Sequence, residues 1–125
     1  IQTDGKNILV DTGIGDKFDE KFQKIFNVDK YHNLLNSLKN VGLGPNDIDI
    51  VINTHLHFDH CGGNTCVREG RVVPTFPKAK YVIQKGEWED AVNPNERTRA
   101  SYLKENFIPN IVDGFTKLPV GRQKI

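Results

Sequence analysis

Short apolar runs that end in turn residues recur along the chain and predict β-strands. The clearest covers residues 7–11, where Ile-Leu-Val leads to Asp11 and then to a Thr-Gly-Ile-Gly turn. Similar β-branched or aromatic runs predict strands over residues 48–54, 81–84 and 115–118. The stretch 68–78 is rich in glycine and proline and is predicted to be a loop.

Apolar residues at helical spacing lie between these strands. The first stripe consists of Phe18, Phe22, Ile25 and Phe26, and it predicts a helix whose apolar side packs in the core. A second stripe over residues 34–41 ends at Gly42, a residue type that commonly terminates helices. Further helices are predicted over residues 85–92 and 97–107. Helices that alternate with strands indicate an α/β fold.

Charge and hydropathy exclude two classes of partner. The 17 basic and 16 acidic residues leave a net charge of +1, and no run of like charge exceeds two residues. A nucleic-acid partner is therefore not expected, because phosphate binding needs a basic patch. No unbroken apolar run exceeds three residues, far fewer than the ~20 that a membrane helix needs, so no membrane partner is expected.

The ends of the chain and its cysteines bear on its origin. No signal-peptide pattern is present, and the two cysteines, Cys61 and Cys66, are too few for a disulfide framework, so we expect a cytoplasmic protein with reduced thiols. Both cysteines are expected to be small buried residues. The chain starts at Ile1 and contains no Met. We therefore expect either a piece of a longer protein or an incomplete sequence.

Three of the four histidines fall within His55-Leu56-His57-Phe58-Asp59-His60. In an extended segment His55 and His57 project to the same side, Asp59 continues the alternation, and His60 follows as the backbone turns. Imidazoles with a carboxylate, and without paired thiolates, suit zinc or another divalent ion that stays open to water. A histidine-rich loop that merely caps a strand is the alternative. The fourth histidine, His32, is expected to be a surface or capping residue.

Two segments together resemble the metallo-β-lactamase superfamily. They are Thr-His-Leu-His-Phe-Asp-His-Cys-Gly-Gly-Asn at residues 54–64 and Ile-Leu-Val-Asp-Thr-Gly at residues 8–13. The resemblance implies an αββα sandwich, in which two sheets pack face to face with helices outside. The family's complete domain is about twice as long, so residues 1–125 are expected to form a partial domain, most of its first half.

The resemblance also implies a role for each site residue. His55 and His57 would bind one metal ion, and Asp59 and His60 a second. Asp11 would orient the loop that carries these four residues, the ligand loop. Two Zn²⁺ ions are expected, with iron or manganese as alternatives. They would share a bridging hydroxide as the nucleophile, and Asp59 would also act catalytically by passing a proton to the leaving group.

The chain departs from the family pattern after residue 60. The family takes a third histidine for each metal and a bridging carboxylate from later segments, yet no histidine follows His60. Asp90 and Asp113 are the only later aspartates, and neither lies in a context that resembles the bridging position. We therefore expect the N-terminal portion of a longer zinc-dependent hydrolase, active only when the missing C-terminal ligands are supplied.

Within the superfamily, several segments are similar to the lactonase and organophosphate-hydrolase group: Phe58, Gly62-Gly63-Asn64, residues 73–81, Glu87-Trp88 and residues 97–106. That group implies a small-molecule ester, lactone or phosphoester substrate and leaves a homodimer open. The alternatives are a glyoxalase II-like thioester hydrolase and a truncated, non-catalytic module. An aspartic protease built on Asp11-Thr12-Gly13 is disfavoured, because it would be nearly all β.

Overall fold

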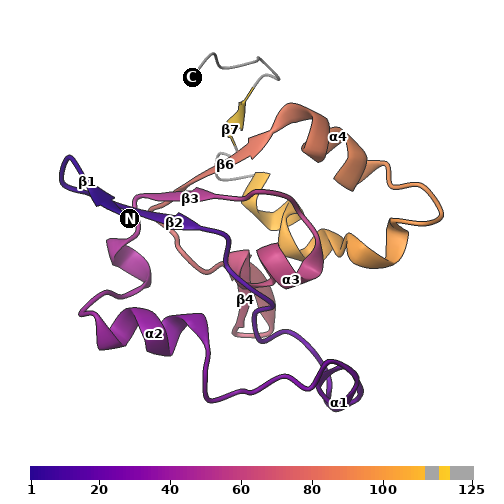
Figure 1. Ribbon diagram of the computed structural model, residues 1–125, viewed down its shortest axis with the longest axis horizontal. Coiled ribbons are helices and arrows are strands. Elements are labelled where there is room, and N and C mark those ends of the chain that lie inside the picture. The colour runs from indigo at the N-terminus through magenta and orange to yellow at the C-terminus, as the bar shows by residue number, and fades with distance from the viewer. Residues whose placement is uncertain (112–115, 119–125) are drawn as a thin grey trace.

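A five-stranded sheet forms the centre of the computed structural model, which describes residues 1–111 and 116–118 (Figure 1). Its strand order is β1-β2-β3-β6-β7. β1 pairs with β2 in antiparallel fashion, and β2, β3, β6 and β7 run parallel. The strands are β1 (Gln2–Thr3), β2 (Lys6–Val10), β3 (Ile50–Ile52), β6 (Lys80–Gln84) and β7 (Thr116–Leu118).

Between the strands, the described residues form four α-helices and five short 3₁₀ turns. The α-helices are α1 (Glu20–Phe26), α2 (Leu34–Asn40), α3 (Phe58–Cys61) and α4 (Lys85–Val92). The 3₁₀ turns are η1 (Pro45–Asp47), η2 (Gly62–Asn64), η3 (Arg99–Ser101), η4 (Lys104–Asn106) and η5 (Ile108–Ile111). The α/β prediction is confirmed. In the described part of the chain, none of the helices has the length and apolar character to cross a membrane.

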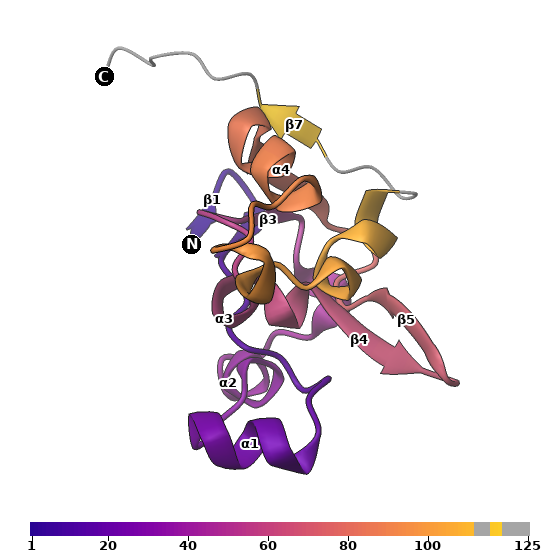
Figure 2. The same ribbon diagram turned by 90° about the vertical axis from the view of Figure 1, so that its right-hand side faces the viewer.

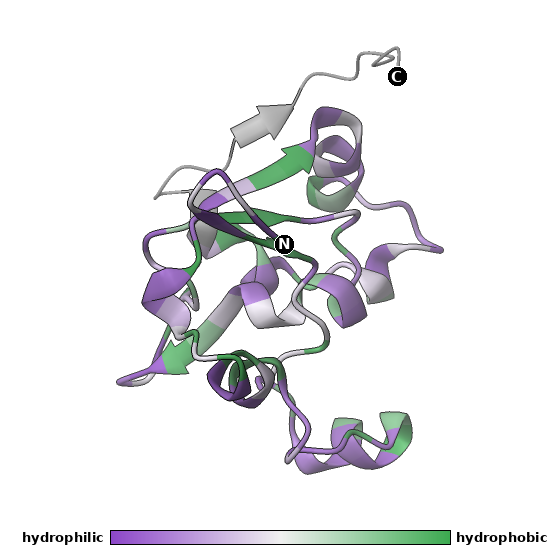
Figure 3. Ribbon diagram, turned by 60° about the vertical axis from the view of Figure 1, so that its left-hand side comes forward, coloured by the Kyte–Doolittle hydropathy of each residue, from purple (hydrophilic) through white to green (hydrophobic). Residues whose placement is uncertain are grey.

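The two faces of the sheet differ in burial. Leu9, Val51 and Tyr81 are register partners. Val51 and Tyr81 belong to a buried core cluster with Leu38 of α2 and Phe76, and the partly buried Leu9 packs against it. On the opposite face, the register partners Val10 and Ile52 remain 46% and 36% exposed. Figure 3 shows these strands as the hydrophobic centre of the molecule. One face of the sheet is therefore covered by the chain, and the other is open.

A second core cluster lies between β6, α4 and the segment that follows β3. It consists of Leu56, Cys61, Ile83, Trp88, Ala91, Tyr102 and Phe107. Cys61 is fully buried, as predicted, whereas Cys66 is only half-buried. Because Leu56 lies within the histidine cluster and Cys61 directly follows it, this core anchors the predicted ligand loop.

The predicted loop over residues 68–78 is correct for residues 69–70 and 75–78 but wrong for Arg68 and residues 71–74, which are strand. Thr65–Arg68 (β4) and Arg71–Pro74 (β5) pair as an antiparallel hairpin that projects from the body (Figure 2). Glu69 and Gly70 form its two-residue turn with φ values of +50° and +73°. Two positive φ angles match the right-handed twist of a hairpin, and the valines on both strands favour β structure. The proline falls at the end of β5, where it does not interrupt pairing.

Two helix predictions also need correction. Residues 97–107 form two of the 3₁₀ turns with irregular backbone between them instead of one helix, and the Asn95 side chain begins the segment by accepting hydrogen bonds from the N–H groups of Arg97 and Thr98. The first stripe forms α1 only from Glu20, with Asp19 as its N-cap, and α1 has no buried residue. Figures 1 and 2 both show α1 at one end of the molecule, away from the sheet.

Candidate metal centre

The parallel pairing of β2 with β3 brings two chemically important segments together. Asp11 directly follows β2, and Thr54 and His55 follow β3, so the carboxyl ends of the two strands present them at one edge of the sheet. The Asp11 N–H donates to the Ile52 carbonyl at 2.8 Å. Asp11 has φ +55°, a left-handed conformation that is uncommon for residues other than glycine and that concentrates at functional sites.

The carboxylate of Asp11 accepts three hydrogen bonds from the ligand loop. Its Oδ1 accepts the Thr54 N–H at 2.8 Å, and its Oδ2 accepts the Thr54 hydroxyl at 2.7 Å and Nδ1 of His60 at 3.0 Å. Partial burial raises the pKa of Asp11, but the hydrogen bonds from His60 and Thr54 outweigh it and hold the pKa below the ordinary value. The anionic Asp11 side chain therefore connects Thr54, at the start of the loop, to His60, at its end.

These hydrogen bonds select one tautomer for two histidines. The Thr54 hydroxyl has one proton, which it donates to Asp11, so its oxygen accepts Nδ1–H of His55 at 3.0 Å. His60 likewise donates Nδ1–H to Asp11. In both rings Nε2 then carries the free lone pair, the form in which imidazole binds a metal.

The three imidazoles lie close together at the end of β3. The ring centroid of His55 lies 4.0 Å from that of His60 and 4.7 Å from that of His57. Oδ2 of Asp59 is 3.6 Å from Nε2 of His60, on the side opposite the Asp11 contact. The expectation that Asp59 continues an extended alternation is wrong, because α3 begins at Phe58 and places both Asp59 and His60 on one helical turn.

Glycines let the Asp11 segment lie directly on the ligand turn. The Thr12 N–H donates to the His60 carbonyl at 2.8 Å, and Gly13 forms a β-bridge with Cys61. A Cβ atom at Gly62 would collide with the Ile14 carbonyl, and one at Gly63 with the Thr12 carbonyl. The Gly-Gly pair after the histidine cluster is thus a requirement for this close backbone packing.

The Lys17 side chain links the segment after Asp11 to the turn after the histidine cluster through hydrogen bonds from its ammonium group. Its Nζ donates to the carbonyls of Gly62 and Thr65, the latter at 2.9 Å. Burial lowers the pKa of Lys17, and nearby Glu105 partly offsets that shift. The ammonium group therefore stabilises the backbone immediately after α3.

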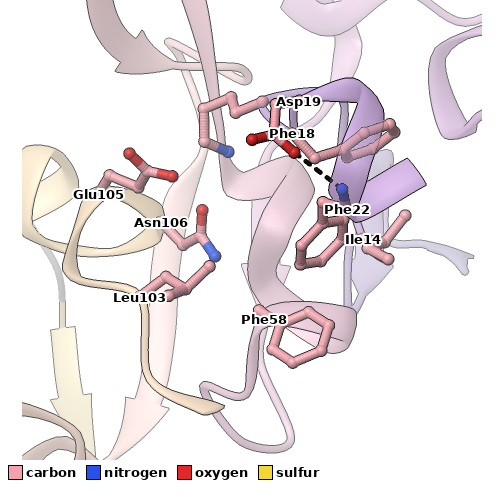
Figure 4. Close-up of a pocket in the computed structure, with 9 residues that line it drawn as sticks. Ile14, Phe18, Asp19, Phe22, Phe58, Leu103, Glu105 and Asn106 are labelled. Atoms are coloured by element: carbon pink, nitrogen blue, oxygen red, sulfur yellow. Dashed lines mark hydrogen bonds between the residues drawn. The ribbon is translucent and has the colours of Figure 1, made fainter. Parts of the chain in front are cut away.

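A cavity of about 300 Å³ opens beside the ligand loop (Figure 4). Phe58, which follows His57, forms part of its wall, and its ring lies 5.4 Å from that of Phe22 in an edge-to-face contact. The remaining lining residues are Ile14, Lys17, Phe18, Asp19, Leu103, Glu105 and Asn106. Phe18 and Phe22 therefore line a pocket instead of the core that their spacing predicted.

The donor set fits part of a metal centre. Neutral imidazoles with free Nε2 atoms and a nearby carboxylate are ordinary ligands for zinc and similar divalent ions. However, within residues 1–111 and 116–118 no group of three or more His, Cys, Asp or Glu side chains is arranged so that it could hold a metal ion. Asp90 is exposed on α4, and Asp113 lies outside the described residues. Metal binding by His55, His57, Asp59 and His60 stays a prediction.

Sequence reasoning missed several residues that hold this loop. The side chains of Thr54 and Lys17 make the contacts described above, and Glu87 accepts the Leu56 N–H. Tyr102 packs in the core and also contacts His57 edge to face, with ring centroids 4.9 Å apart. A single sequence gave no signal for these pairings, because the partners are 15 to 48 residues apart or carry no motif of their own.

Comparisons with known proteins place the chain in a family. A family model described as the metallo-beta-lactamase superfamily matches residues 1–121. An N-acyl homoserine lactonase from a Bacillus species is 32% identical over 121 residues, which cover 89% of this chain and 43% of the relative. The chain therefore spans less than half the length of that relative.

Solved structures match over nearly the whole chain. A probable metal-dependent hydrolase from Staphylococcus aureus is 32% identical with a TM-score of 0.83, and the match covers 99% of this chain and 44% of that structure. AidC, a dizinc quorum-quenching lactonase in complex with a product, is 25% identical with a TM-score of 0.69, covering 99% and 42%. About half of the fold is present, and by its family match the chain belongs to the metallo-beta-lactamase superfamily.

Proposed function

We propose that this chain contributes the first part of a dinuclear zinc centre to a hydrolase of small-molecule lactones, esters or phosphoesters, with lactones favoured. The observation that carries the proposal is the Asp11 carboxylate, which fixes Thr54 and His60 and through them leaves Nε2 of His55 and of His60 free. Lactonase and hydrolase relatives support the reaction class.

Each residue of the proposed site has a separate role in metal binding or catalysis. His55 and His57 would hold one ion, Asp59 and His60 a second, and zinc would supply a water of lowered pKa and polarise the scissile bond. Asp11 orients the imidazole of His60 directly and that of His55 through Thr54, and it places a negative charge beside them. Asp59, whose side chain is 54% exposed beside His60, is placed to bind a metal and to exchange a proton with a leaving group.

The adjoining cavity supports a substrate with an apolar portion. Its wall includes the aromatic rings of Phe18, Phe22 and Phe58, and Phe58 connects it directly to the ligand loop. Polar and charged side chains, among them Lys17 and Asn106, line the rest. A hydrophobic wall next to polar groups suits an acyl or alkyl group attached to a hydrolysable ester.

A substrate panel tests this proposal. The full-length protein is assayed on lactones of increasing acyl length, a thioester and a phosphotriester, before and after chelation. We expect the lactones to be hydrolysed fastest, activity to disappear on chelation, and Zn²⁺ to restore it. Phe22→Ala should weaken the preference for longer acyl chains, whereas Ile25→Ala on the exposed side of α1 should not.

Two outcomes would contradict the proposal. Hydrolysis that survives complete removal of metal excludes a metal-dependent reaction. A thioester turned over much faster than every lactone assigns the protein to the glyoxalase II-like alternative.

A further inference from the structure

Glu87 of α4 accepts hydrogen bonds from the ligand loop and from a tyrosine beside it. Its Oε1 accepts the Leu56 N–H at 2.8 Å and the Tyr102 hydroxyl at 3.1 Å. Leu56 is the single residue between His55 and His57, and its side chain is fully buried. The carboxylate therefore holds the backbone at the centre of the predicted ligand pair.

Tyr102 extends this contact to an imidazole. Its ring meets the His57 ring edge to face, with centroids 4.9 Å apart and planes at 73°. Tyr102 is 9% exposed and belongs to the same core cluster as Leu56. Burial, together with Glu87, raises the pKa of Tyr102 to about 12, so the hydroxyl keeps its proton and donates at neutral pH.

We infer that Glu87 is a positioning residue of the metal site: through the Leu56 N–H and through Tyr102 it sets the direction of the His57 imidazole. This inference rests on the proposed function, since it assumes that His57 binds a metal. Asp11 orders His55 and His60, but its hydrogen bonds do not reach His57. Glu87 and Tyr102 supply the corresponding support for His57.

The physical reason is preorganisation. A ligand side chain that rotates freely must lose that freedom when the ion binds, which weakens binding. A fixed Leu56 backbone limits where His57 can lie, and the Tyr102 ring limits how its imidazole turns. Supporting contacts of this kind change metal affinity by about 10-fold to 100-fold when they are removed.

Glu89 provides a matched control on the same helix. Its side chain is 61% exposed and forms an ion pair with Lys85 at 3.6 Å, one turn away. Glu87→Ala, Glu87→Gln, Tyr102→Phe and Glu89→Ala are compared in the full-length protein. The readouts are Zn²⁺ affinity against a competing chelator, the visible spectrum with Co²⁺, and NMR signals of the His57 ring without metal.

We expect Glu87→Ala to weaken Zn²⁺ binding by about 10-fold to 100-fold and to change the Co²⁺ spectrum. Glu87→Gln should retain most of the affinity, because its side-chain oxygen accepts the same two hydrogen bonds. Tyr102→Phe keeps the ring on His57 but loses the hydroxyl, so an intermediate effect is expected. Glu89→Ala should match the wild-type protein.

Wild-type affinity and spectrum in Glu87→Ala would overturn the inference, and so would a Glu87→Gln variant as weak as Glu87→Ala. Lower thermal stability with an unchanged Co²⁺ spectrum would assign Glu87 a structural role only. If Glu87→Ala does not fold, the spectrum of Tyr102→Phe decides. If the wild-type protein binds no metal, the proposed function fails, and His57 ring signals that do not move in Glu87→Ala overturn the inference as well.

Discussion

Asp11 shows how much one side chain can organise. It adopts a left-handed backbone conformation at the end of β2, where its two oxygens accept hydrogen bonds from Thr54 and His60. The sequence motif indicated that an aspartate would lie here, and the family resemblance implied that it would orient the loop. The relay through the Thr54 hydroxyl to His55 could not be foreseen, because it depends on the exact geometry of two adjacent strand ends.

Asp11→Asn tests that organisation. The amide keeps the size of the side chain, but it replaces one charged acceptor oxygen with an NH₂ group that cannot accept from Thr54 or His60. We expect metal affinity to fall by about 10-fold to 100-fold with little change in secondary structure. Chelator competition measures the affinity, and circular dichroism checks the fold. An unchanged affinity would show that Asp11 does not orient the ligands.

His32 offers a pH-dependent test far from the site. Its Nδ1 lies 2.5 Å from Oδ2 of exposed Asp29, and that hydrogen bond raises the pKa of His32 and lowers that of Asp29. Because the His32 pKa is raised on folding, the pair contributes stability at pH below the ordinary value of 6.5, and the contribution disappears as pH rises through the raised value. At acid pH it also disappears, as pH falls through the lowered pKa of Asp29.

NMR titration of the His32 ring measures this shift directly. We expect a midpoint above 6.5 in the wild-type protein and a return toward 6.5 in Asp29→Asn. Equal midpoints in the two proteins would mean that the Asp29 contact does not persist in solution.

At the scale of elements, periodicity succeeded where one face of an element is buried. It located β2, β3, β6, α2 and α4, whose apolar residues meet the two core clusters. It failed for the hairpin at residues 65–74, where a two-residue turn and a terminal proline resemble a loop. It also failed for the aromatic stripe of α1, because the same spacing serves a cavity wall as well as a core.

The Gly-Gly turn makes a prediction at this scale. Gly62→Ala places a Cβ against the Ile14 carbonyl. The two backbone segments that carry these atoms cannot move apart without a cost in free energy. We expect a loss of about 1–3 kcal/mol in the free energy of unfolding, measured by urea denaturation. Gly44→Ala is the control, since its φ is −119° and its nearest contact is the Asp47 carboxylate at 3.5 Å. Equal effects of the two substitutions would rule out the close packing of the two loops.

At the scale of the whole molecule, the sheet has an open face, and the histidine cluster lies beside it. Val10 and Ile52 remain partly exposed on one face, and the histidine cluster lies at the edge of the same strands. The matched part covers 43% of the lactonase relative and 44% of the Staphylococcus aureus structure, so about half of the fold is present. The motifs at residues 8–13 and 54–64, through the family resemblance that they carry, predicted that only part of the domain is present.

Metal analysis of the full-length protein, alongside His57→Ala and Asp59→Ala, tests the central claim most directly. The proposed centre predicts about two zinc ions per wild-type chain and loss of metal in both variants, since each removes one ligand from a different ion. The matched control is His32→Ala, which removes an exposed histidine outside the loop and should leave the metal content unchanged. Wild-type metal content in both His57→Ala and Asp59→Ala would contradict the assignment of the site.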